Sequence, residues 1–452
     1  YGKRKYFTRR SVHIMPASEA SLYEELILES NDRSRSVDIK LGTISIDYFE
    51  DLFSPTITAQ VRVVNTGDSI AKEGSKERQS IYNGLPLRGG ERLSMKVLDQ
   101  GKANNKGKEK TGLDFTDPEQ NLIVSSITDV ISQSERETFL LNLVSQEAIT
   151  NETTRVFKKY SSIISTSVEK ILTDDRIGFK LDRSRYEIDP TSNEYKFIGN
   201  LRKPFTTLVW LASKSVGDSS NDTTAGFLFY QTQDGFKFKS IEKLTKQSSK
   251  ATYTFTEVNE SSISKNNDFR ILNYTIDRNQ NLLEKLRLGT YSSVRLTFDP
   301  LNFKMRQRIF KFDESGIDKL GNKVVLPKIS EESNKTLSDV PSRLFSQVID
   351  RGTIEPDASK KTNADPTKYQ AQSTMRYNLL LTQLLSITVP CNTDLRAGDI
   401  ITCQFPKVSR QDSERFDEET SGKYIIKELC HHFDPDRSFT SMKLVRDSFG
   451  DA

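Results

Sequence analysis

The sequence contains few of the residues that most often carry chemistry in proteins: three cysteines, three histidines and one tryptophan among 452 residues. The cysteines (Cys391, Cys403 and Cys430) are too few and odd in number for a disulfide framework, which favours a reducing compartment. No apolar run approaches the roughly 18 residues of a membrane span. The basic stretch from Tyr1 to Arg10 lacks an apolar segment, so it is not a secretory signal; residues 1 to 20 are expected to form an extended arm. A net charge of +4 is nearly neutral for this length and predicts no strong polyanionic partner.

Motifs that bind phosphates or hold catalytic nucleophiles are also missing. The chain has no Gly-x-x-x-x-Gly-Lys-Ser/Thr loop, no Gly-x-Gly-x-x-Gly after a strand and no Gly-x-Ser-x-Gly elbow. Histidine, the commonest general base, occurs only as His13, His431 and His432. Carboxylates are scattered through predicted loops, where a solvated surface is a simpler interpretation than a hydrolytic pair. We therefore expect no catalytic or cofactor-binding residues and no enzymatic activity.

The segment Cys430-His431-His432 brings metal-binding side chains onto a predicted strand. Cys430 and His432 would share one face of this strand, and Cys403 could approach from a neighbouring strand. However, the chain has no Cys-x-x-Cys or His-x-x-x-His spacing, and no fourth ligand is evident. Buried thiols that act as small apolar residues are the simpler interpretation, so we expect no metal site and no cofactor.

Strand patterning is what the chain does contain, most clearly between Asp394 and Phe449. Ile400 to Phe405, Tyr424 to Leu429 and Ser438 to Val445 each read as a strand, and Asp434-Pro435-Asp436 reads as a turn. This region therefore predicts three antiparallel strands, which must find partners earlier in the chain.

Those partners are indicated by an ordered set of matches between the two halves of the chain. The matches are Ile44-Ser45-Ile46-Asp47 with Tyr274-Thr275-Ile276-Asp277, Val61-Arg62-Val63 with Val294-Arg295-Leu296, Leu87-Arg88-Gly89-Gly90-Glu91 with Leu395-Arg396-Ala397-Gly398-Asp399, Leu122 to Ile127 with Tyr424 to Leu429, and Leu143-Val144 with Leu444-Val445. Any one match could arise by chance. Their common order favours duplication of one β-unit over the alternative, which is two ordinary antiparallel sheets.

Between the two β-units the periodicity changes to that of helices. A helix is expected over Ser161 to Leu172, and another after Pro204, where apolar side chains follow three and four residues apart. Asp234-Gly235, flanked by Phe227 to Tyr230 and Phe236 to Phe238, predicts a β-hairpin. This part of the chain is therefore expected to form a small α+β module inserted between the β-units.

Other elements are predicted from shorter patterns. Val37 to Ile46 alternates as a strand with a bulge at Gly42, and Asp47 to Pro55 reads as a loop. Helices are expected at Pro341 to Val348 and at Gln370 to Gln383.

Three segments allow two interpretations each. Leu22 to Leu28 is a short strand or a short helix. Trp210 stands among apolar neighbours, which favours core packing over ligand stacking. The lysines from Lys102 to Lys110 could contact DNA, but no aromatic residue is interleaved with them, so a solvated loop is the simpler interpretation.

Four groups of segments carry a resemblance to a known family. They are Gly84-Leu85-Pro86-Leu87-Arg88-Gly89-Gly90-Glu91, Lys203-Pro204-Phe205 with Trp210-Leu211-Ala212, Gly226 to Tyr230 with Asp234 to Phe238, and the region from Leu395 to Phe449. Together they resemble the baseplate hub proteins of contractile-tailed bacteriophages, which are related in fold to the N-terminal part of type VI secretion spike proteins. The resemblance covers most of the chain, and its motifs are structural rather than catalytic. The loops at 100–111, 313–367 and 410–420 look longer than in a minimal hub.

The resemblance implies a mainly β fold with α+β insertions, in which each chain supplies two related antiparallel β-barrel, tail-tube-like domains and an inserted α+β module. It implies a homotrimer whose six barrels form a pseudo-six-fold ring between the six-fold tail tube and the three-fold central spike. The implied partners are the spike protein, the tube or tube-initiator protein, and baseplate wedge and tape-measure proteins. DNA would pass through the ring without sequence-specific binding. The implied location is the virion baseplate, assembled in the host cytoplasm without stable membrane insertion.

The expected organisation has five parts. They are an N-terminal arm (1–20), a first β-barrel domain (21–158), the inserted α+β module (159–262), a second β-barrel domain (263–312 and 384–452) and a connecting region (313–383). A structural hub is the favoured function. A receptor- or glycan-binding tail protein would need an exposed aromatic platform, and a cell-wall-degrading tail component would need a functional carboxylate cluster.

Overall fold

The computed structural model describes most of the chain. The described residues are 21–66, 70–71, 78–85, 87–98, 112–133, 135–177, 179–218, 225–256, 269–278, 280–312, 317–322, 326, 328–329, 334–351, 363, 366–407 and 416–450. The arm predicted at 1–20 and the loop predicted at 100–111 lie outside these residues, as do parts of the loops predicted at 313–367 and 410–420.

The described residues form 24 β-strands and seven α-helices, which confirms a mainly β fold with α+β insertions. The strands are β1 (Leu22–Glu29), β2 (Ser36–Asp38), β3 (Thr43–Asp51), β4 (Thr58–Asn65), β5 (Ile70–Ala71), β6 (Arg78–Gln79), β7 (Arg92–Leu98), β8 (Gly112–Phe115), β9 (Leu122–Ser132), β10 (Glu137–Val144), β11 (Lys159–Ile163), β12 (Tyr186–Ile188), β13 (Glu194–Ile198), β14 (Phe227–Thr232), β15 (Gly235–Ser240), β16 (Thr252–Thr254), β17 (Asn273–Arg278), β18 (Ser292–Asp299), β19 (Lys304–Lys311), β20 (Arg343–Val348), β21 (Gln383–Pro390), β22 (Ile400–Gln404), β23 (Gly422–Phe433) and β24 (Ser438–Arg446). The helices are α1 (Ile81–Gly84), α2 (Gln146–Thr153), α3 (Ile164–Thr173), α4 (Pro204–Ala212), α5 (Ile241–Thr245), α6 (Leu282–Leu288) and α7 (Pro366–Leu380), with short 3-10 turns η1 (Lys40–Gly42) and η3 (Arg183–Arg185). None of the helices in the described part of the chain is long and apolar enough to span a membrane.

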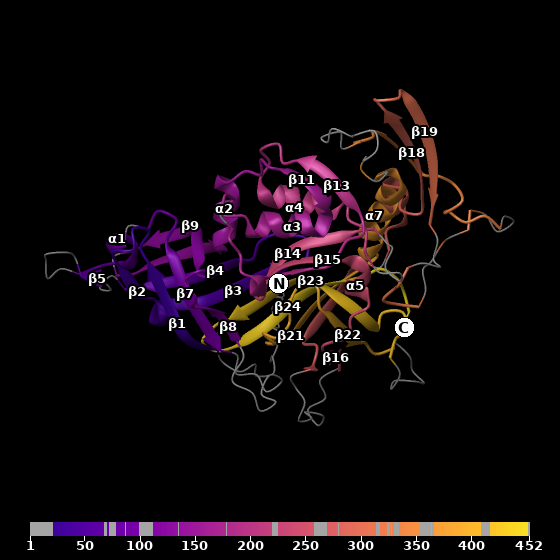
Figure 1. Ribbon diagram of the computed structural model, residues 1–452. Coiled ribbons are helices and arrows are strands. Elements are labelled where there is room, and N and C mark those ends of the chain that lie inside the picture. Colours follow the sequence, from indigo (N-terminus) through magenta and orange to yellow (C-terminus); the bar gives the residue numbers. More distant parts are fainter. Residues whose placement is uncertain are drawn as a thin grey trace, which may run out of the picture.

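One large sheet of 14 strands runs through both β-units (Figure 1). Its order is β17-β21-β24-β23-β3-β4-β10-β9-β7-β1-β2, with β8 beside β7, β22 beside β23 and β16 beside β22. The first unit contributes β1 to β4 and β7 to β10, and the second contributes β16, β17 and β21 to β24. The two units meet where β23 pairs with β3, so they are joined edge to edge rather than by loops alone.

The strands of the first unit form because their apolar residues alternate and point into one core. In β4 and β10 every second residue is buried, and the buried set includes Val61, Val63, Phe139 and Leu141. The loop predicted over Asp47 to Pro55 is wrong for Asp47 to Asp51, which continue β3, and holds for the residues after Asp51. Pairing of this segment with β23 of the second unit extends the strand, and a local pattern does not reveal such a partner.

The duplication is visible in the strand order, since β3-β4-β10-β9-β7 corresponds to β17-β21-β24-β23-β22. Four of the five sequence matches lie on corresponding strands or their preceding turns. The match of Val61-Arg62-Val63 with Val294-Arg295-Leu296 is wrong, because β21 takes the place of β4 and β18 lies in another sheet. The match of β3 with β17 joins the correct strands but is displaced by two residues, since Tyr48 rather than Ile46 corresponds to Ile276.

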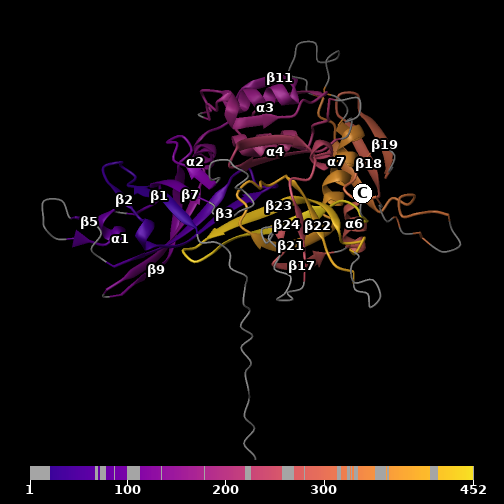
Figure 2. The same ribbon diagram turned by 90° about the horizontal axis from the view of Figure 1, so that it is seen from below.

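The inserted module covers the large sheet near the junction and has its own core (Figure 2). It contains the three-stranded sheet β12-β15-β14, the pair β11-β13 and helices α3 and α4. The predicted hairpin at Asp234-Gly235 is confirmed as β14 and β15. The helix predicted from Ser161 starts later, at Ile164, because the preceding residues form β11 and pair with β13.

A third sheet, β19-β18-β20, stands apart from the large sheet, and α7 packs beside it (Figures 1 and 2). We call these three strands the arm sheet. The helix predicted at Pro341 to Val348 is wrong, because residues 343–348 form β20, parallel to β18. Leu344 and Val348 are four residues apart, a spacing that places them on one side of a helix and also on one face of a strand. The predicted helix at Gln370 to Gln383 is confirmed, with α7 ending at Leu380.

Candidate functional site

The first of two equivalent turns precedes β7 and contains Leu87 to Glu91. The Glu91 carboxylate accepts a hydrogen bond from the Arg88 backbone N–H at 2.6 Å, and the Gly90 N–H donates to the Val124 carbonyl at 2.8 Å. The Val124 N–H donates back to the Glu91 carbonyl at 2.9 Å. Gly90 has a φ of 89°, a conformation that side chains disfavour and glycine adopts freely. The turn therefore starts β7 and ties it to β9.

The second turn, Leu395 to Asp399, repeats this arrangement before β22. The Asp399 carboxylate accepts from the Arg396 N–H at 2.7 Å, and the Gly398 N–H donates to the Ile426 carbonyl at 2.8 Å. The Ile426 N–H donates to the Asp399 carbonyl at 2.9 Å, and Gly398 has a φ of 90°. The hydrogen bonds and the φ of the glycine repeat at matching positions. Two unrelated antiparallel sheets would have no reason to share these details. The prediction of a duplicated β-unit therefore agrees with the structure at atomic detail.

The same equivalence extends into a β-bulge. In the first unit Ser125 is left out of the pairing between β9 and β10, and in the second unit Lys427 is left out of the pairing between β23 and β24. Both residues lie directly after the residue that bonds to the glycine of the turn. A bulge increases local twist and redirects the strand that carries it. In the second unit the redirected strand, Glu428 to Phe433, is the part that pairs with β3.

The junction between the units is organised around one buried carboxylate, Glu50 on β3. Its Oε1 accepts from the Tyr48 hydroxyl at 2.9 Å and from the Gln233 backbone N–H at 2.7 Å, and its Oε2 accepts from the Ala397 N–H at 2.9 Å. Gln233 belongs to the hairpin turn of the inserted module, and Ala397 belongs to the turn of the second unit. A single side chain therefore connects all three parts of the chain.

Burial raises the pKa of Glu50, and the nearby Arg396 guanidinium opposes that rise. Arg396 also forms an ion pair with Asp234 of the module hairpin at 3.2 Å. A buried carboxylate with three donors is well satisfied, and removing it would leave those donors without partners. Sequence reasoning missed Glu50 because it falls in a predicted loop. The signal that could have found it is the alternation of β3, which Tyr48, Glu50 and Leu52 continue.

On the polar face of the sheet, the junction is closed by His432. Its Nδ1 lies 2.6 Å from Asp47 Oδ1, and its Nε2 lies 3.5 Å from Asp434 Oδ2. The hydrogen bond with Asp47 and the two carboxylate charges raise the pKa of His432. The neighbouring His431 points the other way, is fully buried and stacks on Tyr48; burial lowers its pKa to about 3. The two histidines therefore lie on opposite faces of one strand, and the pKa is raised for His432 and lowered for His431.

The three side chains considered as metal ligands do not come together. Cys403 is buried on β22 in the core of the second unit and faces Gly422, near the start of β23. Cys430 lies eight residues further along β23, roughly 25 Å at the rise of a strand. Cys430 and His432 do share a face, and both approach Asp47. Among the described residues no group of three histidine, cysteine, aspartate or glutamate side chains could hold a metal ion.

β17 and β9 each keep one edge without a partner in the described chain, as do the short outer strands β2 and β8. β17 pairs with β21 on one side, and β9 pairs with β10 along its length and with β7 only at its first residues. From Thr128 to Ser132 the side chains of β9 are exposed, including Val130 (41% exposed) and Ile131 (57%). On β17, Thr275, Ile276 and Asp277 are exposed. Unpaired edges with apolar side chains are ready to pair with another chain.

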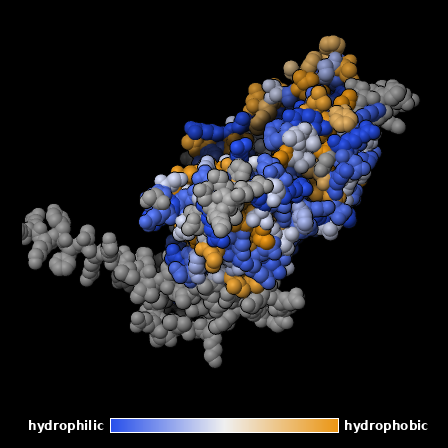
Figure 3. All heavy atoms as spheres, turned by 90° about the vertical axis from the view of Figure 1, so that its left-hand side faces the viewer, coloured by the Kyte–Doolittle hydropathy of each residue, from blue (hydrophilic) through white to orange (hydrophobic). Residues whose placement is uncertain are grey.

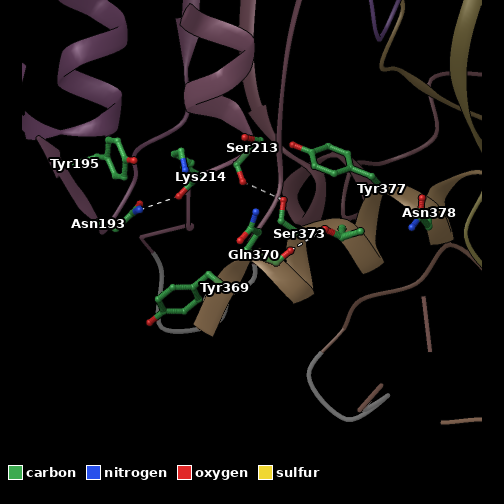
Figure 4. Close-up of a pocket in the computed structure, with 10 residues that line it drawn as sticks. Asn193, Tyr195, Ser213, Lys214, Tyr369, Gln370, Ser373, Tyr377 and Asn378 are labelled. Atoms are coloured by element: carbon green, nitrogen blue, oxygen red, sulfur yellow. Dashed lines mark hydrogen bonds between the residues drawn. The ribbon is translucent and has the colours of Figure 1, made fainter. Parts of the chain in front are cut away.

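A cavity of about 320 Å³ lies between the inserted module and α7 (Figure 4). Its lining residues are Asn193, Tyr195, Ser213, Lys214, Tyr369, Gln370, Ser373, Thr374, Tyr377 and Asn378. Asn193 donates to the Lys214 carbonyl at 2.8 Å, and Ser373 donates to the Ser213 carbonyl at 3.2 Å. None of these lining residues is a carboxylate or a histidine. Beside it Trp210 packs edge-on against Tyr195 and Phe197, as expected of a core residue.

Comparison with known proteins gives related results in sequence and in fold. No family model matches the chain. The probable baseplate hub protein gp334 of Vibrio phage KVP40 is 22% identical over 303 residues, which cover 65% of this chain and 67% of that protein. The tail protein from Neisseria meningitidis MC58 aligns with 95% of this chain and 97% of its own at a TM-score of 0.53 and 8% identity, which shows a shared fold.

A second solved structure is a component of the type VI secretion system, the c3393 protein of E. coli. It aligns with 90% of this chain and 75% of its own at a TM-score of 0.41 and 9% identity. In sequence and in fold, therefore, the chain resembles the baseplate hub and tail proteins of phages, as its sequence motifs predicted.

Proposed function

We propose that this protein is a structural hub of a phage tail baseplate, without enzymatic activity. It acts as a homotrimer in which six related β-units form a pseudo-six-fold ring. The ring joins the six-fold tail tube to the three-fold central spike and surrounds the channel through which the genome leaves. Its partners are the spike, the tube or tube-initiator protein, and neighbouring wedge and tape-measure proteins. The similarity to a phage baseplate hub protein supports this role.

The observation that carries the proposal is how the two units are joined. Inside the chain β23 of the second unit pairs with β3 of the first. The strands that correspond to these two are β9 and β17, and each of them has an unpaired edge. If β9 of one chain pairs with β17 of the next, the intrachain junction is repeated between chains. Repetition of one heterologous contact closes into a ring when the rotation allows it.

The intrachain junction also predicts the register between chains. His432 lies opposite Asp47 at the junction. In the first unit Ile131 takes the place of His432, because Thr138 and Phe439, their partners on β10 and β24, correspond. In the second unit Thr275 takes the place of Asp47, because their partners on β21 and β4, Ser386 and Gln60, correspond. We therefore expect Ile131 of one chain to lie opposite Thr275 of the next.

The polar face of the large sheet suits a channel through which DNA passes without binding. Three of its cations are paired with carboxylates: Lys443 with Glu428 at 2.8 Å, Arg62 with Asp129 at 3.5 Å and Lys427 with Asp51 at 3.8 Å. Tight DNA binding relies on unpaired lysine and arginine side chains that neutralise phosphates. Pairing of these three cations would weaken the hold of this face on the genome.

Light scattering after size-exclusion chromatography tests the assembly. The purified chain should elute at three times its 51.5 kDa mass, about 154 kDa. A monomer at every concentration, both alone and with the spike protein of the same virion, would rule out the trimer.

A further inference from the structure

The arm sheet is folded with its apolar face outward, which is the reverse of an ordinary surface sheet. On the central strand β18, Arg295, Thr297 and Asp299 are buried. They face α7, where Arg295 donates to Thr374 at 3.4 Å. The residues that alternate with them along the strand, Val294, Leu296 and Phe298, face outward and are only half-buried. Antiparallel sheets that meet water on one side normally turn their polar residues to it.

The flanking strands extend this apolar face. Met305 is opposite Phe298 and is 71% exposed, and Ile309 is opposite Val294 and is 53% exposed. On β20, Leu344 (61% exposed) and Val348 (64%) lie on the same face. Hydrophobic side chains gather at the top of the molecule in Figure 3, at the height where Figure 1 places the β18–β19 hairpin. A contiguous apolar face of this kind marks an interaction surface.

The tip of the β18–β19 hairpin presents an aromatic ring in an unusual backbone conformation. Phe303 has a φ of 53° and is 80% exposed, and its ring touches Phe298 of the apolar face edge-on. A bulky residue with positive φ is strained, and such strain persists where the surroundings or the function require it. Leu301, at the same tip, is 62% exposed. The tip therefore adds to the apolar face rather than capping it with polar residues.

The position of the arm sheet decides which molecule can reach its apolar face. The arm sheet follows β17 through the short helix α6, so it starts near the C-terminal end of β17, which has an unpaired edge. At the intrachain junction the C-terminal end of β3 lies beside Glu428, the position that Ser126 of β9 occupies in the first unit. If the contact between chains repeats this geometry, the C-terminal end of β17 lies beside Ser126 of the neighbouring chain. There β9 runs next to the end of β10, directly before α2.

We propose that the apolar face of the arm sheet docks on a second copy of this chain, at α2 and the adjoining part of the inserted module, near β9. This proposal rests on the proposed ring, which brings that part of the neighbour to the arm. Exposed apolar side chains lie there: Ile149 on α2 (42% exposed) and Phe157 (46%), directly before the module, and Leu201 (67%) within it. Val156 is bridged to Arg202, so Phe157 and Leu201 lie close together. The arm would thus hold neighbouring copies together outside the sheet, as a second contact.

The test uses the full-length chain with Leu344→Lys and Val348→Lys combined. Both side chains are exposed, so the monomer should keep its melting temperature, while the trimer should dissociate at a concentration about 10- to 100-fold higher. The matched control is Leu41→Lys, a fully exposed leucine far from the arm, which should change neither quantity. A photo-crosslinking benzoylphenylalanine in place of Phe303 should yield a product of two chain masses, with cross-linked peptides from residues 145–157 or 198–203.

The outcomes separate this proposal from the ring. A wild-type trimer that is unaffected by the two lysines and gives no interchain product from position 303 would overturn the docking of the arm and leave the ring intact. A product that forms only with another virion protein would assign the face to that protein and overturn the second-copy assignment. The ring itself would be wrong if the wild-type chain stays monomeric and a variant with cysteines introduced on β9 and β17 forms no disulfide between chains.

Discussion

At the scale of single residues, Glu50 is where the three parts of the chain are most closely coupled. Replacing it with glutamine keeps the size but places an amide N–H₂ against backbone donors, so at least one donor of Tyr48, Gln233 and Ala397 loses its acceptor. We expect Glu50→Gln to lower the free energy of unfolding by about 1–3 kcal/mol.

The control for this change is the neighbouring carboxylate Asp51, whose ion pair with Lys427 spans 3.8 Å near the surface. Asp51→Asn should cost less than about 1 kcal/mol. Urea denaturation of the three proteins checks both values. Equal costs for the two variants would show that Glu50 does not hold the junction.

His432 makes the junction sensitive to pH. Its pKa is raised in the folded chain by Asp47, so its stabilising contribution is complete below the unfolded pKa of about 6.5 and is lost as the pH rises through the folded value. His432→Asn should therefore reduce stability more at pH 6 than at pH 8. Comparing wild type with variant at each pH cancels the opposite effect of His431, which is buried and neutral in both proteins. The same difference at both pH values would contradict the role given to the His432–Asp47 pair.

At the scale of elements, much of the fold was predictable because local patterns and their order repeat. The turns at Leu87 to Glu91 and Leu395 to Asp399 were recognisable because a positive φ requires glycine and the bonded carboxylate must follow it directly. The error at Val294 to Leu296 arose because alternation marks a strand without naming its partner. β18 has the pattern of β4, but its polar residues are the buried ones.

The errors at β3 and β20 have a related cause. Both segments became strands through pairing with residues far along the chain, β23 for β3 and β18 for β20. The junction was likewise beyond sequence reasoning, because Glu50, Gln233 and Ala397 become neighbours only in the folded chain. Local sequence predicts an element well when its hydrogen bonds are made to residues nearby in the chain. It predicts an element less well when the conformation depends on pairing with a strand far along the chain.

At the scale of the whole molecule, the large sheet has a direction. It begins with β17, crosses from the second unit to the first at β23 and β3, and reaches β9 before β7, β1 and β2 complete the first unit. The one junction inside the chain places β23 of the second unit against β3 of the first. In the proposed ring, the same kind of contact would join β9 of one chain to β17 of the next.

The register between chains gives the most direct test of the ring. We would combine Ile131→Cys with Thr275→Cys in the full chain, oxidise it and run it on a non-reducing gel. The control pair His432→Cys with Asp47→Cys lies at the equivalent positions inside one chain, where directly opposed strand residues are close enough for a disulfide. We expect the first pair to give species of two and three chain masses, and the control pair to form its disulfide within single chains. If the control pair oxidises while the first pair remains at one chain mass, β9 does not pair with β17 and the proposed ring is wrong.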